Sequence, residues 1–299
     1  MRYVILALLL LGAGCGTPGS PPPGGAVLTW VPPTTPRAVV VAVHGFADYR
    51  AAFAEFGRYA AANGVLVEAY DQPGFGSHPA RGRWPGTPEL IGALEAAVEA
   101  AKARHPGSPI FVLGESMGAS VVLAAARESL PAEGLILAAP AVWNGSDLPS
   151  AYRTTLRILA SLAPALRVDG RNLKRQASDN IPMLRALGRD PLYLRQTRLD
   201  AVAGLVELMV ESQAMAPDLR LPTLVLLGAR DQMVPPRASR RFVATLDPRT
   251  CSVVTYVNGW HLLLRDHQRE KVFADILAWV DHTPLPSGLD HPCGPAPQS

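Results

Sequence analysis

Short apolar runs alternate along the chain with stretches in which apolar residues recur at helical spacing. Buried strands are predicted by the predominantly apolar runs at 39–43, 65–70, 110–113, 135–138, 224–227 and 253–257. A helix is predicted to begin near Thr87, because proline and an acid follow it and apolar residues then recur every four positions. Alternation of such strands and helices predicts an α/β fold with a mostly parallel sheet.

The alternation is interrupted at about 143–215, where no strand-like run occurs. Two amphipathic stretches, at 152–159 and 202–209, predict helices there, so we interpret this segment as a helical insertion between two strands. Core packing is the simplest interpretation of its apolar residues. Three methionines are also candidates for a flexible apolar wall beside a substrate: Met183, Met209 and Met215.

Composition is that of one globular domain, which we place at 38–282. With 299 residues, 48% of them hydrophobic, the chain can bury a single large core. The net charge of +3 gives no reason to expect nucleic acid as a partner. No paired cysteine spacing or HExxH-type helix is present, so neither a metal site nor any other cofactor is predicted.

The first 14 residues have the pattern of an export signal. A positive charge at Arg2 precedes an apolar stretch at 3–11 that is too short to span a bilayer, and small residues then lead to Cys15. This arrangement resembles the bacterial lipoprotein signal, in which the cysteine thiol is acylated and becomes the first residue. The alternative is an ordinary secretory signal with an incidental cysteine. We therefore expect an exported, membrane-anchored bacterial lipoprotein, and Gly16 favours the outer membrane because it stands where an aspartate would suggest inner-membrane retention.

Segments rich in proline flank the predicted domain. Residues 15–37 are expected to form an extended tether, and residues 283–299 form a second proline-rich tail. With Cys15 used for lipid, Cys251 and Cys293 are the remaining thiols, and an exported compartment favours a disulfide between them. Two unpaired thiols are the alternative, because disulfide geometry is demanding.

The candidate chemistry centres on Ser116, which lies between a predicted strand and a predicted helix in Gly-Glu-Ser-Met-Gly. A sharp strand-to-helix turn exposes such a hydroxyl and requires small residues on either side. Serine becomes a good nucleophile only when a base takes its proton. Asp231 and His261 each follow a predicted strand, and the order serine, acid, histidine is the one expected for an open parallel sheet. These three residues are the predicted catalytic triad.

An oxyanion hole is predicted from two backbone N–H groups. One belongs to Met117, the residue after the candidate nucleophile, and the other to Phe46 in the His-Gly-Phe loop that follows the strand at 39–43. His44 in that loop is interpreted as a structural hydrogen-bonding residue, not a second base.

Five motifs in this order resemble the monoacylglycerol lipase and lysophospholipase group of α/β-hydrolases, which is related to the S33 serine aminopeptidases. They are the loop at 44–46, the turn at 71–77, the serine motif at 114–118, the stretch at 228–231 and the stretch at 259–263. The resemblance implies an α/β-hydrolase fold with a helical cap at about 143–215. It also implies hydrolysis of carboxylic esters of single acyl chains. Glu115 stands where lipases of this group often carry histidine.

Other functions are compatible with the same residues. A small-molecule carboxylesterase or an acyltransferase would keep the triad unchanged. A proline-releasing peptidase is disfavoured, because such enzymes usually carry tryptophan at the position of Met117. A catalytically idle, surface-binding lipoprotein is disfavoured because it would have no need of a complete triad and oxyanion loop.

Overall fold

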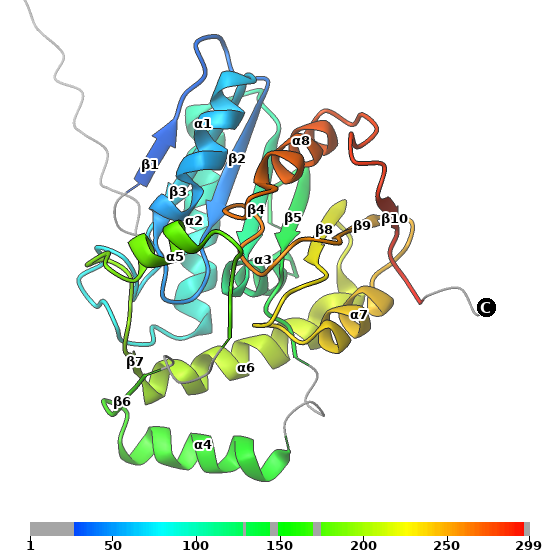
Figure 1. Cartoon of the computed structure of the whole chain (residues 1–299). Helices are drawn as coiled ribbons and strands as arrows, with labels where there is room; N and C mark the ends of the chain where they lie inside the picture. Colours follow the sequence, from blue (N-terminus) through cyan, green and yellow to red (C-terminus); the bar gives the residue numbers. More distant parts are fainter. Residues whose placement is uncertain (1–26, 128–129, 144–148, 170–174, 296–299) are drawn as a thin grey trace, which may run out of the picture.

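A computed structural model of the chain describes residues 27–127, 130–143, 149–169 and 175–295. Its centre is a sheet of eight strands in the order β1-β3-β2-β4-β5-β8-β9-β10 (Figure 1). The strands are β1 (Val27–Trp30), β2 (Ala38–Val43), β3 (Val65–Tyr70), β4 (Ile110–Glu115), β5 (Gly134–Ala138), β8 (Thr223–Gly228), β9 (Cys251–Tyr256) and β10 (Asp290–Pro292). The six central strands pair in parallel, which confirms the predicted mostly parallel sheet.

Helices cover both faces of this sheet. They are α1 (Ala54–Ala62), which follows the short helix η1 (Arg50–Phe53), α2 (Thr87–Arg104), α3 (Met117–Ala126), α7 (Pro236–Thr245) and α8 (Arg269–Val280). Side chains alternate between two cores along each strand: in β2, Val39 and Val41 pack with α2 and α3, whereas Val40 packs with α1 and α8. Burial on both faces explains why the central strands are continuous apolar runs in the sequence.

Between β5 and β8 the chain forms a helical insertion, of which α4 and α6 lie at the bottom of Figure 1 and α5 lies higher, near β3. Its helices are α4 (Ser150–Leu162), α5 (Ile181–Leu187) and α6 (Leu199–Met215), followed by the short helix η4 (Ala216–Asp218). The expectation that this segment has no strand was wrong. Strands β6 (Arg167–Val168) and β7 (Thr197–Arg198) pair antiparallel, and two residues each are too few to produce a periodic pattern.

The sheet extends beyond the predicted domain limits of 38–282 at both ends. Part of the predicted tether at 15–37 is strand β1, which pairs antiparallel with β3, and part of the tail at 283–299 is strand β10, which pairs antiparallel with β9. Both are short edge strands, and Pro292 is tolerated in one because an edge strand needs fewer ladder hydrogen bonds. The predicted signal peptide at 1–14 and Cys15 lie outside the described residues.

A disulfide fixes the tail to the sheet. Cys251 at the start of β9 is bonded to Cys293, with 5.3 Å between the two Cα atoms. The backbone N–H of Cys293 also donates to the carbonyl oxygen of Cys251 at 2.9 Å. Among the residues that the structure describes, no helix has the length and apolar character needed to cross a membrane.

Candidate active site

Ser116 occupies the single-residue turn between β4 and α3. Its backbone has φ 55° and ψ −117°, a region that residues with side chains rarely adopt. The turn is tight enough that a Cβ on Gly118 would collide with the carbonyl oxygen of Val43, and a Cβ on Gly114 would lie 2.6 Å from the Cα of Ala119. Glycine at both positions therefore lets the chain turn and present a half-buried hydroxyl at the carboxyl end of the sheet.

The three residues of the predicted triad lie in one hydrogen-bonded row. His261 Nε2 is 2.8 Å from Ser116 Oγ, and His261 Nδ1 is 2.8 Å from Asp231 Oδ2. A carboxylate can only accept, so the proton on the ring lies on Nδ1, and Nε2 is left to accept from the serine hydroxyl. This is the tautomer that a general base needs.

The carboxylate of Asp231 is held by its own loop. Its second oxygen, Oδ1, accepts from the backbone N–H groups of Met233 at 2.7 Å and Val234 at 3.0 Å. Oδ2 therefore points toward the imidazole. The side chains of His261 and Asp231 are 8% and 7% exposed, so little water competes for their hydrogen bond.

The loop that follows β2 lies against the candidate nucleophile. A Cβ on Gly45 would lie 3.3 Å from the Cβ of Ser116. Phe46 packs edge-on against Phe75, with ring centroids 5.5 Å apart, and this contact fixes the loop. On the other side of the serine, Met117 begins α3, where backbone N–H groups have no partner within the helix. Ser116 is therefore contacted by the loop that carries Phe46 and is followed directly by Met117.

His44 is part of the scaffold of that loop. Its Nε2 accepts from the backbone N–H of Gln72 at 3.1 Å, so its Nδ1 carries the proton and donates to the carbonyl oxygen of Gly45 at 2.8 Å. Burial lowers the pKa of His44, which favours the neutral ring. These contacts agree with a structural role and leave no ring nitrogen free to act as a base.

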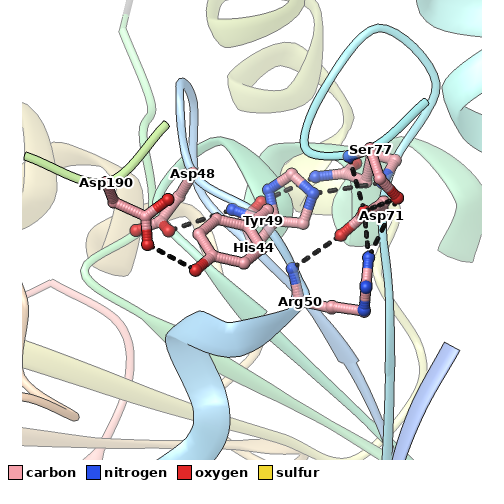
Figure 2. A network of polar contacts seen from close by, with 8 residues as sticks. His44, Asp48, Tyr49, Arg50, Asp71, Ser77 and Asp190 are labelled. Atoms are coloured by element: carbon pink, nitrogen blue, oxygen red, sulfur yellow. Dashed lines mark hydrogen bonds and ion pairs between the residues drawn. The ribbon is translucent and has the colours of Figure 1, made fainter. Parts of the chain in front are cut away.

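A buried carboxylate organises the neighbouring turn, as Figure 2 shows. Asp71 accepts from the backbone N–H groups of Arg50 at 2.9 Å and Ser77 at 2.8 Å, and it also forms an ion pair with the Arg50 guanidinium. A Cβ on Gly76 would collide with this carboxylate. Asp71 therefore joins two loops and does not face the candidate nucleophile.

Insertion residues contact all three loops of the candidate site. Tyr49 donates to Asp190 at 2.6 Å, a bond drawn in Figure 2, and Ser178 donates to Asp266 at 2.5 Å beside the His261 loop. Near the Asp231 loop, Gln176 N–H donates to the side chain of Gln232 at 2.9 Å. The insertion is therefore hydrogen-bonded to the loops that form the candidate site.

The three candidate wall methionines lie in different surroundings. Met209 on α6 is buried beside Ala141 and Val234, and Ala141 N–H donates to the carbonyl oxygen of Ser116 at 3.1 Å. Met215 packs against the main core, and Met183 is half-buried on α5. Met209 is therefore connected to Ser116 through Ala141.

The sequence did not predict two charged residues of the site, Asp48 and Arg265. Arg265 forms ion pairs with Asp48 at 2.7 Å and with Glu115 at 3.0 Å. The available signal was Glu115 itself, a charged residue at the end of an otherwise apolar strand, which requires a partner when buried. Within the described ranges, no group of three or more histidine, cysteine, aspartate or glutamate residues could hold a metal ion.

Comparisons with known proteins identify the family of the chain. The family model for serine aminopeptidase, S33, matches residues 34–268. A monoacylglycerol lipase of Mycolicibacterium smegmatis is 28% identical over 255 residues, which are 84% of this chain and 90% of the relative. Phospholipase YtpA of Bacillus subtilis is 27% identical over 252 residues, which are 82% of this chain and 96% of the relative.

The fold has a close counterpart among solved structures. The crystal structure of Paleococcus ferrophilus monoacylglycerol lipase superimposes with a TM-score of 0.74 at 22% sequence identity, over 86% of this chain and 99% of that one. The match of the family model covers most of the chain, and the fold agrees with it. The chain therefore belongs to the serine aminopeptidase S33 family, as an α/β-hydrolase of its monoacylglycerol lipase-like group.

Proposed function

We propose that this carboxylic ester hydrolase cleaves esters of single acyl chains, of the monoacylglycerol or lysophospholipid type, through Ser116. The observation that carries the proposal is the row of two 2.8 Å hydrogen bonds from Asp231 through His261 to Ser116. Nucleophilic acyl transfer requires an acid, a base and a hydroxyl that are hydrogen-bonded in this order, with the hydroxyl exposed on a tight turn.

The reaction proceeds in two halves. Ser116 Oγ attacks the ester carbonyl carbon as its proton passes to His261 Nε2, and Asp231 stabilises the imidazolium that forms. The backbone N–H groups of Phe46 and Met117 hold the oxyanion of the tetrahedral intermediate. The C–O bond to the alcohol then breaks, the alcohol takes the proton from His261, and water hydrolyses the acyl-enzyme by the same steps. No cofactor takes part.

Two observations support a lipid substrate. The names of the relatives from M. smegmatis and B. subtilis describe enzymes that act on monoacylglycerols and phospholipids. In addition, the insertion exposes a row of large apolar side chains, of which Leu162 is 77% exposed: Tyr152, Ile158, Leu159, Leu162 and Leu166. Several large apolar side chains exposed in one segment suit an enzyme that meets its substrate at a lipid surface.

We also propose that the enzyme is exported and anchored through Cys15. The supporting observations are the apolar leader that ends at this cysteine and the disulfide between Cys251 and Cys293, because disulfides persist in oxidising compartments. A secreted, unanchored enzyme is the alternative.

A chain-length series tests the substrate class. We expect kcat/KM for p-nitrophenyl esters and 1-monoacylglycerols to rise from acetyl through medium chains, since each buried methylene contributes about 0.8 kcal/mol, and then to level. A maximum at acetyl with a steady decline would identify a small-molecule carboxylesterase. Faster formation of a new ester than of free fatty acid, with an alcohol acceptor present, would identify an acyltransferase.

A further inference from the structure

The side chain of Arg265 is buried between two carboxylates. One terminal nitrogen, Nη2, lies 2.7 Å from Asp48 Oδ2 and 3.0 Å from Glu115 Oε2. The side chains of the three residues are 8%, 5% and 1% exposed, so none of these charges is solvated by bulk water. Buried charges of this kind depend on one another, because removal of one leaves the others uncompensated.

Each residue of this cluster stands next to a different part of the site. Asp48 follows Phe46 by two positions in the oxyanion loop, Glu115 immediately precedes Ser116, and Arg265 follows His261 by four positions. The three segments meet at Arg265 although Glu115 and Arg265 are 150 residues apart in the chain. A single guanidinium thus joins the loops that carry the oxyanion donor, the nucleophile and the base.

Arg265 carries the positive charge in this cluster, and the two carboxyl groups depend on it for compensation. Burial raises the pKa of Glu115, whereas the positive charge of Arg265 acts in the opposite direction. The second oxygen of Glu115, Oε1, has no hydrogen-bond partner, so Arg265 supplies the polar contact that Glu115 has within the sheet. Without Arg265, the two buried carboxyl groups behind Ser116 would lose their counter-charge, and the contacts that join the loops would be lost.

We infer that Arg265 is a positioning residue that sets the distances among the oxyanion loop, Ser116 and His261 through its contacts with Asp48 and Glu115. The inference rests on the proposed function of Ser116. Arg265 does not touch the reacting atoms, and it acts on the rate through the placement of those that do. A displacement of about 1 Å between reacting groups can lower a rate about 10²-fold.

The test compares Arg265→Met and Arg265→Lys with a matched control. We expect Arg265→Met to lower kcat about 10²-fold while KM changes less than about threefold, and to slow fluorophosphonate labelling in parallel. Arg265→Lys should recover most of the lost kcat, because one nitrogen makes both contacts and an ammonium has three donors. The control is Glu68→Gln, which breaks the ion pair between the buried carboxylate of Glu68 in β3 and the exposed Arg104 in α2, and which should lower stability without changing kcat.

All rates are measured at a temperature at which circular dichroism shows each variant to be folded. Wild-type kcat and labelling rate in Arg265→Met, or an equal fall of kcat in Glu68→Gln at equal loss of Tm, would overturn the inference. If Arg265→Met does not fold, Glu115→Gln takes its place: a fall in kcat at constant KM supports the inference, and unchanged kcat overturns it. Failure of the wild-type enzyme to react with fluorophosphonate would instead overturn the proposed function.

Discussion

A Cβ on Gly45 would lie 3.3 Å from the Cβ and 3.9 Å from the Oγ of Ser116. Because Gly45 has no side chain, the backbone of the oxyanion loop lies closer to Ser116 than a larger residue would comfortably permit. An added methyl group would lie in contact with Oγ, and we expect it to crowd the ester carbonyl that Oγ attacks.

We accordingly expect Gly45→Ala to lower kcat/KM on the order of 10²-fold, comparable to the loss of one oxyanion donor. Steady-state kinetics on a short p-nitrophenyl ester checks this. The matched control is Gly92→Ala in α2, where no atom lies within 4 Å of the added Cβ. That variant should keep full activity and gain about 0.5 to 1 kcal/mol in free energy of unfolding. Equal activity of the two variants would contradict the prediction.

Substitutions in the triad are expected to lower kcat to different degrees. Ser116→Ala should lower kcat by a factor on the order of 10⁴ or more and abolish fluorophosphonate labelling, with the fold unchanged by circular dichroism. His261→Ala should be about as severe, because serine and histidine act as a unit. Asp231→Asn should leave more residual activity than either. Ester turnover near the wild-type rate in folded Ser116→Ala would mean that another group is the nucleophile.

Cys15 is expected to carry the membrane anchor. Wild-type protein expressed in a bacterial host should fractionate with membranes and have acyl mass on its first residue, whereas Cys15→Ser should be released or remain unprocessed. Intact-mass analysis and fractionation measure both. Cys251→Ser provides the comparison, because it removes a cysteine of the disulfide and leaves the predicted site of acylation intact. A mature wild-type chain without acyl mass would exclude the anchor.

The pH dependence of stability should contain a contribution from Asp266. Burial raises the pKa of this carboxyl to about 6, although hydrogen bonds from Ser178 and Trp260 favour the charged form. The pKa of Asp266 is higher in the folded protein than in the unfolded chain. The protonated carboxyl therefore contributes to the free energy of unfolding fully below about pH 4, and this contribution is lost as the pH rises through 6.

Urea unfolding of wild type and Asp266→Asn between pH 4 and pH 7.5 isolates this contribution, since all other titrating groups are shared. We expect the difference in free energy of unfolding, wild type minus variant, to fall with rising pH by at most about 3 kcal/mol. A difference that stays constant or rises with pH would contradict the assignment.

The central strands were predictable because both of their faces are buried, which forces continuous apolar runs such as that of β2. The turn at Ser116 was predictable for a related reason: the surrounding glycines are required by contacts with Val43 and Ala119 that no larger residue permits. In these places local sequence and tertiary contact impose the same residue types.

Other features depend on contacts that no local pattern records. Strands β1 and β10 are edges with one neighbour each, so their residues are half-exposed or exposed and do not form a buried apolar run. The cluster of Asp48, Glu115 and Arg265 joins three distant segments of the chain. Glu115 at the end of an apolar strand indicates that a partner is needed, but Asp48 and Arg265 have no local pattern that identifies them as that partner. Only the assembled sheet brings them together.

Strand β10 has a consequence for the behaviour of the protein at high concentration. It covers the outer edge of β9 with three paired residues, and the disulfide between Cys251 and Cys293 keeps it there. An uncovered strand edge is a template for pairing with a second chain. The disulfide thus keeps the edge of β9 covered and unavailable to a second chain. Reduction of the disulfide would allow β10 to separate from β9 and would favour aggregation through the exposed edge.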